Sequence, residues 1–161
     1  MTQTFEGPYS GRGLRVAVAA SRFNESITKA LVDGAVDCLK RHGLGDEDIS
    51  VTWVPGAFEL PLAAQRLALS GDVDAVVCIG AVIKGETAHF EYVSQHALAG
   101  IGRVSLETGV PVTCGILTTY TVEQATDRAG GKAGNKGFEA ALAAIEMANL
   151  LASMPKARPE L

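Results

Sequence analysis

The apolar run from Asp74 to Ile83 is the feature that most constrains the fold of this chain. After its first residue the run contains only Ala, Val, Cys, Ile and Gly. A short segment this apolar and rich in β-branched residues is typical of a strand that is covered on both faces. The run ends in the loop 84–87, and a helix is predicted to start near Ala88. This sequence of strand, loop and helix favours a parallel sheet between two helical layers.

The rest of the chain repeats this alternation. Residues 14–20, 49–54 and 112–117 form three further short apolar runs, each expected to be a strand. Segments with apolar residues at helical spacing lie between and after them, which gives the order β-α-β-α-β-α-β-α-α. Right-handed crossovers then predict a three-layer α/β/α sandwich with a four-stranded parallel sheet. We expect one domain at residues 14–152, an N-terminal arm at residues 1–13 and a flexible tail at residues 153–161.

Three local signals predict details of the loops. Asn24 is a favourable N-cap for the first helix, and a second helix is expected to begin near Phe58. Thr121 and Gln124 have the spacing of a capping box, which predicts a short helix carrying Arg128. Residues 130–137 form a glycine-rich break before the last helix.

Composition excludes several classes of function. The net charge of -4 argues against a general nucleic-acid binder, which needs a basic face. No apolar run approaches the about 20 residues of a membrane span, and the first residues do not resemble a signal peptide. The three cysteines are scattered and odd in number. This pattern suits reduced thiols in a cytoplasmic protein and not a disulfide framework.

The unusual residues gather in loops at the expected carboxyl ends of the strands, where open α/β sheets bind ligands. His89 is the sharpest candidate because it stands at the mouth of a helix and can titrate near neutral pH. The alternative is a helix-capping or surface histidine. His96 lies two turns further on, but no third ligand at matching spacing supports a metal site.

A phosphate site is also suggested by the loop before His89. The segment from Gly80 to Thr87 resembles a P-loop, but Glu86 stands where a triphosphate needs Lys. We therefore exclude nucleotide hydrolysis and keep a single phosphate at Gly85, Glu86 and Thr87, held by backbone amides. Arg128 and Lys136 are either solvated charges or anion ligands. Cys114 is interpreted as a buried residue and not as a nucleophile.

Five segments in register resemble the lumazine synthase family of riboflavin biosynthesis. They are residues 22–24 (RFN), 54–61 (VPGAFELP), 80–93 (GAVIKGETAHFEYV), 115–119 (GILTT) and 128–137 (RAGGKAGNKG). The resemblance implies a flavodoxin-like fold. It also implies condensation of 5-amino-6-(D-ribitylamino)uracil with 3,4-dihydroxy-2-butanone 4-phosphate to give 6,7-dimethyl-8-ribityllumazine, phosphate and water, without metal or organic cofactor.

The same resemblance implies roles for single residues. His89 would transfer protons, and Arg128 would hold the phosphate together with Gly85, Glu86 and Thr87. The ribitylaminouracil would be bound by a larger set, consisting of Phe23, Ala57, Phe58, Glu59, Ala81, Val82, Ile83, Cys114 and Lys136. Two positions depart from the usual pattern of the family. Cys114 stands where many members have Phe, and Lys84 replaces a common Arg.

The resemblance further implies a homo-oligomer whose active sites lie between subunits. Cys114, Arg128 and Lys136 would then come from the neighbour of the subunit that provides His89. Members form pentamers, and some form shells of sixty subunits that can enclose riboflavin synthase. The short break at residues 131–137 resembles that of shell-forming members. An archaeal-type riboflavin synthase, a non-catalytic flavin or lumazine carrier, and a purely structural shell protein are the alternatives.

Overall fold

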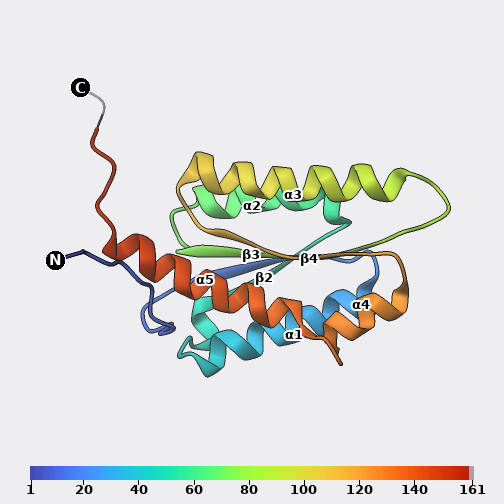
Figure 1. Ribbon diagram of the computed structural model, residues 1–161, viewed down its shortest axis with the longest axis horizontal. Helices are drawn as coiled ribbons and strands as arrows, with labels where there is room; N and C mark the ends of the chain where they lie inside the picture. Colours follow the sequence, from blue (N-terminus) through green and yellow to red (C-terminus); the bar gives the residue numbers. More distant parts are fainter. Residues whose placement is uncertain (160–161) are drawn as a thin grey trace.

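The computed structural model describes residues 1–159 and confirms the expected three-layer α/β/α architecture (Figure 1). One sheet of four parallel strands crosses the middle of the molecule in the order β2-β1-β3-β4. This strand order is flavodoxin-like. The strands are β1 (Val16–Ser21), β2 (Ile49–Val54), β3 (Ala75–Ile83) and β4 (Val112–Thr119).

The helices divide between the two faces of the sheet. In Figure 1, α2 and α3 lie above the sheet, and α1, α4 and α5 lie below it. The bounds are α1 (Glu25–Arg41), α2 (Leu60–Leu69), α3 (His89–Thr108), α4 (Val122–Arg128) and α5 (Lys136–Ser153). Short 3₁₀ turns at Asp46–Asp48 and Ala57–Glu59 precede β2 and α2.

The central strands are buried because helices cover both of their faces. All six residues of β1 and all but the last residue of β3 are buried. Alternate side chains enter two separate clusters. Val18, Val77 and Ile79 pack toward α1 and α5, whereas Ala19, Val76 and Cys78 pack toward α2 and α3. This arrangement explains why the apolar run of β3 has no polar alternation.

Three local predictions need comment. Asn24 stands at the predicted N-cap position of α1. The prediction that its side chain caps the helix is wrong, because that side chain makes no hydrogen bond to the helix start. The helix start predicted near Phe58 lies in a 3₁₀ turn at Ala57–Glu59, and α2 itself begins at Leu60 directly after this turn. The capping box is confirmed by the bond from the Gln124 amide to Thr121 Oγ1, 3.0 Å.

The glycine-rich segment before α5 contains regular structure that the sequence analysis did not include. β5 (Ala129–Gly131) and β6 (Gly134–Asn135) pair as a small antiparallel ribbon. Gly130 and Gly134 have positive φ angles of 105° and 85°, a conformation that glycine adopts without strain. The segment is therefore a tight hairpin that leads directly into α5.

The two ends of the described chain differ in their contacts. The Asn149 side chain on α5 donates hydrogen bonds to the carbonyl oxygens of Pro8 and Ser10, at 2.7 and 2.8 Å. Residues 154–159 follow α5 without helix or strand, and residues 160–161 of the predicted tail lie outside the described residues. Among the helices of residues 1–159, none has the length and apolarity that a membrane crossing requires.

Candidate functional site

Loops from three neighbouring strands enclose a cavity at the carboxyl end of the sheet. The loop after β1, the turn between β2 and α2, and the connection from β3 to α3 meet there because parallel strands end at the same edge. The cavity has a volume of about 360 Å³. Its lining consists of Phe23, Gly56, Ala57, Phe58, Glu59, Ala81, Val82, Ile83, Gly85, Thr87, His89, Phe90 and Val93.

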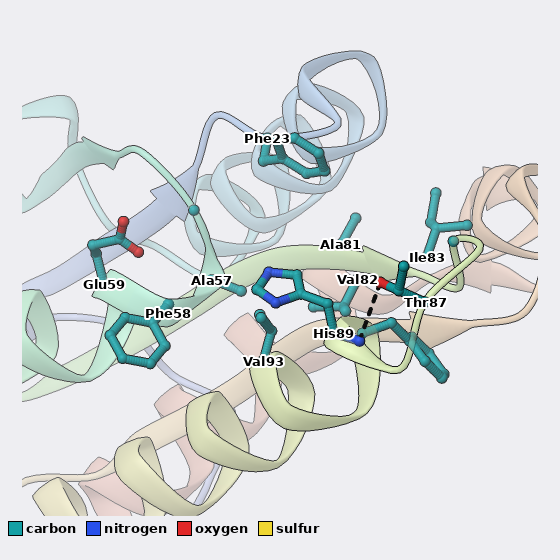
Figure 2. A pocket seen from close by; sticks show the side chains of 13 residues that line it. Phe23, Ala57, Phe58, Glu59, Ala81, Val82, Ile83, Thr87, His89 and Val93 are labelled. Atoms are coloured by element: carbon teal, nitrogen blue, oxygen red, sulfur yellow. Dashed lines mark hydrogen bonds between the residues drawn. The ribbon is translucent and has the colours of Figure 1, made fainter.

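His89 is the first residue of α3 and has an exposed side chain. Its backbone amide donates to Thr87 Oγ1 at 3.4 Å, so the threonine satisfies one of the free amides of the helix start. Figure 2 shows the imidazole ring pointing back from this helix start over the pocket, with Phe23 and Phe58 on different sides of it. The exposed ring therefore faces the space in which a bound molecule would lie.

Two exposed aromatic rings border the cavity. The exposed fraction of Phe23 is 72%, and that of Phe58 is 57%. The ring of Phe58 stacks on the ring of His96, with centroids 4.0 Å apart and an angle of 19° between the ring planes. Exposed aromatic faces in a hollow offer stacking surfaces to a flat heterocycle. The Glu59 carboxylate adds a polar acceptor at the rim.

The floor of the cavity is the end of β3, at Ala81, Val82 and Ile83. Its position is fixed on one side by β4, because these residues pair with Leu117, Thr118 and Thr119. The loop that follows β3 is tied to β4 as well, through the bond from the Lys84 amide to the Thr119 carbonyl oxygen, 2.9 Å. A rigid strand end therefore carries the loop with Gly85 and Thr87.

Arg128 and Lys136 lie in a different place. They line a second cavity of about 310 Å³, together with Ile116, Leu117, Thr118, Ala133 and Glu139. This second cavity shares no lining residue with the cavity around His89. Arg128 is exposed, and its Nη1 donates to the Gln124 carbonyl oxygen at 3.0 Å. In this single chain, these two cations therefore line a cavity that His89 does not line.

Two further predicted residues are absent from the lining of the first cavity. Glu86 is exposed in the loop before α3, but it does not line the cavity. Cys114 is half-buried on β4, beside Cys78 of β3. Burial and the neighbouring Cys114 raise the pKa of the Cys78 thiol. The prediction that Cys114 contributes to a neighbouring subunit's site remains a prediction for a single chain.

The cavity also includes residues that the sequence analysis did not select as site residues, namely Gly56, Phe90 and Val93. Phe90 and Val93 lie in the first two turns of α3. Val93 follows His89 by one helical turn, and residues at this spacing lie on one helix face. That spacing was the feature of the sequence from which Val93 could have been predicted as a cavity residue. In residues 1–159, no three His, Cys, Asp or Glu side chains are grouped so that they could hold a metal ion.

Comparison with known families gives a match over nearly the whole folded region. Residues 13–152 match a family model described as 6,7-dimethyl-8-ribityllumazine synthase. The matched range contains the four strands of the main sheet, the loops around the first cavity, and both Arg128 and Lys136.

Proposed function

The chain belongs to the 6,7-dimethyl-8-ribityllumazine synthase family, and we propose that it catalyses the reaction for which the family is named. In this reaction, 5-amino-6-(D-ribitylamino)uracil condenses with 3,4-dihydroxy-2-butanone 4-phosphate. The products are 6,7-dimethyl-8-ribityllumazine, phosphate and water. The observation that carries the proposal is the convergence of His89, two aromatic rings and an exposed loop with Gly85 and Thr87 on one cavity.

The cavity suits the pyrimidine substrate. A flat ring can stack on Phe23 while the apolar end of β3 contacts its edge. The Glu59 carboxylate accepts hydrogen bonds, which suits the hydroxyl groups of a ribityl chain. The loop from Gly85 to Thr87 precedes the start of α3, where free backbone amides favour a phosphate group.

The proposed reaction proceeds through an imine. The 5-amino group attacks the ketone carbon, and water leaves as the C=N bond forms. Loss of a proton next to the imine and departure of phosphate give an enol, which tautomerises to a carbonyl group. The ribityl-bearing nitrogen then attacks this carbonyl carbon, and a second water leaves. His89 moves protons in these steps, which is general acid–base catalysis.

We further propose that the complete site lies between two subunits. Arg128 and Lys136 provide cations suited to the phosphate and the ring carbonyl groups, but they line a separate cavity in the single chain. A neighbouring copy that places its second cavity against the first would bring these cations to His89. A pentamer, alone or within a shell of sixty subunits, satisfies this requirement, and light scattering separates the two sizes.

Mixing the two substrates with the purified protein tests the proposed function. We expect lumazine absorbance to grow together with release of inorganic phosphate. A flavin or lumazine carrier, or a structural shell protein, would release no phosphate. An archaeal-type riboflavin synthase would consume added lumazine and would not need the butanone phosphate. Either of these results would overturn the proposal.

A further inference from the structure

Asn24 has a backbone conformation that is unique among non-glycine residues in the described chain. With φ 61° and ψ 50°, it is the single non-glycine residue of positive φ in residues 1–159. Asparagine tolerates this left-handed conformation better than most residues do, because its short side chain can form local hydrogen bonds. The conformation turns the chain sharply between the end of β1 and the start of α1.

The side chain of Asn24 makes a long-range contact in place of the expected helix cap. Its Nδ2 donates a hydrogen bond of 2.8 Å to the carbonyl oxygen of Ala81, which is 57 residues away in sequence. The pairing of β1 with β3 ends at Ala20 and Ile79. Asn24 therefore supplies a hydrogen bond to β3 beyond the last paired residue of β1.

The other side of the same turn is attached to β2. The amide of Arg22 donates to the Val54 carbonyl oxygen at 2.8 Å, and the amide of Phe23 donates to the Pro55 carbonyl oxygen at 3.1 Å. Hydrogen bonds thus connect the turn to both strands that flank β1. The ring of Phe23 is nevertheless exposed at the cavity, so a fixed backbone carries a free aromatic face.

We propose that Asn24 is a positioning residue that holds the Phe23 ring and the end of β3 at the spacing required by the pyrimidine substrate. Phe23 precedes Asn24 in the chain, and Ala81 receives its hydrogen bond, so one side chain connects two parts of the cavity wall. This inference rests on the proposed function. Fixing a binding surface before the ligand arrives lowers the cost of ordering it on binding.

Two substitutions separate the hydrogen bond from the backbone conformation. Asn24→Gly keeps the positive φ angle but removes the donor. Asn24→Asp keeps the shape and also tolerates positive φ, but it places an acceptor against the Ala81 carbonyl oxygen. A role through backbone conformation alone would leave both variants close to the wild type. If the hydrogen bond carries the role, Asn24→Asp should weaken substrate binding more than Asn24→Gly does.

Steady-state kinetics with each substrate varied in turn test the inference. We expect Asn24→Gly to raise KM for the ribitylaminouracil about three- to tenfold, and Asn24→Asp to raise it roughly tenfold or more. KM for the butanone phosphate and kcat should change less than twofold, because the phosphate loop and His89 are left in place. Calorimetric titration of the ribitylaminouracil alone should give the same ranking without turnover.

Asn149→Asp is the matched control, because it disturbs another asparagine bond to backbone carbonyl oxygens, far from the cavity. It should leave both KM values unchanged. Thermal unfolding of all three variants checks that they fold. Unchanged KM in the two Asn24 variants, or an equal fall in kcat and rise in both KM values, would overturn the inference. A wild-type protein that makes no lumazine would instead refute the proposed function.

Discussion

The side-chain amide of Asn135 donates a hydrogen bond of 3.0 Å to the carbonyl oxygen of Ala30, and so joins the start of α5 to the second turn of α1. The Oδ1 atom of the same side chain accepts from the amide of Phe138 at 3.0 Å and caps α5. One residue therefore starts the last helix and attaches it to the first. The neighbouring Lys136 takes its position from the same helix start.

We expect Asn135→Ala to lower the free energy of unfolding by about 1–3 kcal/mol, because it removes a helix cap and the side-chain hydrogen bond that attaches α5 to α1. Asn135→Asp keeps the capping acceptor but sets an oxygen against the Ala30 carbonyl oxygen, so it should also be destabilised. Denaturant unfolding at one fixed protein concentration measures both. Equal stability of the wild type and the Ala variant would contradict this role.

Gly137 lies at a close approach of α5 to α1. A methyl group at this position would overlap the backbone carbonyl group of Leu31. We expect Gly137→Ala to destabilise the fold by about 1–3 kcal/mol, because the two helices must move apart. Gly102→Ala on α3 is the control, since a methyl group there meets no atom within 4 Å. By helix propensity alone, the control should be neutral or slightly stabilising in thermal unfolding.

His89→Ala should slow lumazine formation by about 10²–10⁴-fold without abolishing it, because general acid–base catalysis is lost while binding and orientation of the two substrates remain. Steady-state kinetics at saturating substrates measure the effect. His42→Asn, at the end of α1 and outside the cavity lining, is the matched control and should keep the wild-type rate. A wild-type rate for His89→Ala would remove this residue from the mechanism.

Arg128→Ala should raise KM for the butanone phosphate by at least about tenfold, because a charge-assisted bond to phosphate is lost. Arg128→Lys should recover part of the loss, since it keeps the charge without the bidentate geometry. Arg41→Ala removes another exposed arginine, one paired with Asp37 on α1, and should have no effect on this KM. A KM that stays unchanged in Arg128→Ala would show that another group holds the phosphate.

Hybrid assemblies test whether the site is shared between subunits. Co-expression of His89→Ala and Arg128→Ala chains at equal amounts should restore activity, because about a quarter of the subunit contacts then combine an intact His89 with an intact Arg128. Each variant expressed alone serves as the control. If both groups acted within one chain, every site in the hybrid would carry one lesion, and activity would not exceed the average of the two variants.

The buried thiols of Cys38 and Cys78 should react more slowly than solvent-exposed thiols do. Burial, reinforced by the neighbouring Asp37 carboxylate, raises the pKa of Cys38 to about 11. Cys78 also has a raised pKa and is fully buried. Because the thiolate is the reactive form, neither residue should react with a disulfide reagent in the native protein at pH 8. In denaturant all three thiols should react, and peptide mapping of the labelled sites distinguishes the two conditions.

Much of the fold could be predicted from local patterns in the sequence. The apolar runs of β1 and β3 show no polar alternation because helices cover both of their faces, and this property is visible without coordinates. The capping box at Thr121 and Gln124 depends on residues three apart and was therefore also predictable. Three of the five family motifs, at residues 22–24, 54–61 and 80–93, contain the residues that line the first cavity, and the other two contain residues of the second cavity.

Other features depend on contacts between residues far apart in sequence. Asn24 is a residue type that favours the N-cap of a helix. Its side chain bonds to the Ala81 carbonyl oxygen at the end of β3 instead, and it therefore does not cap α1. The strand order and register, which place β1 beside β3, bring these two residues together. In the same way, no local pattern shows that Asn135 bonds to Ala30, which is 105 residues away.

The sequence by itself determined the alternation of strands and helices, the loops that carry the unusual residues, and the resemblance to the family. The tertiary structure decided which of those residues meet. It placed Phe23, Phe58 and His89 around one cavity, and Arg128 and Lys136 around another. The physical reason is that periodicity specifies a local conformation, whereas the meeting of distant side chains depends on strand order, register and helix packing.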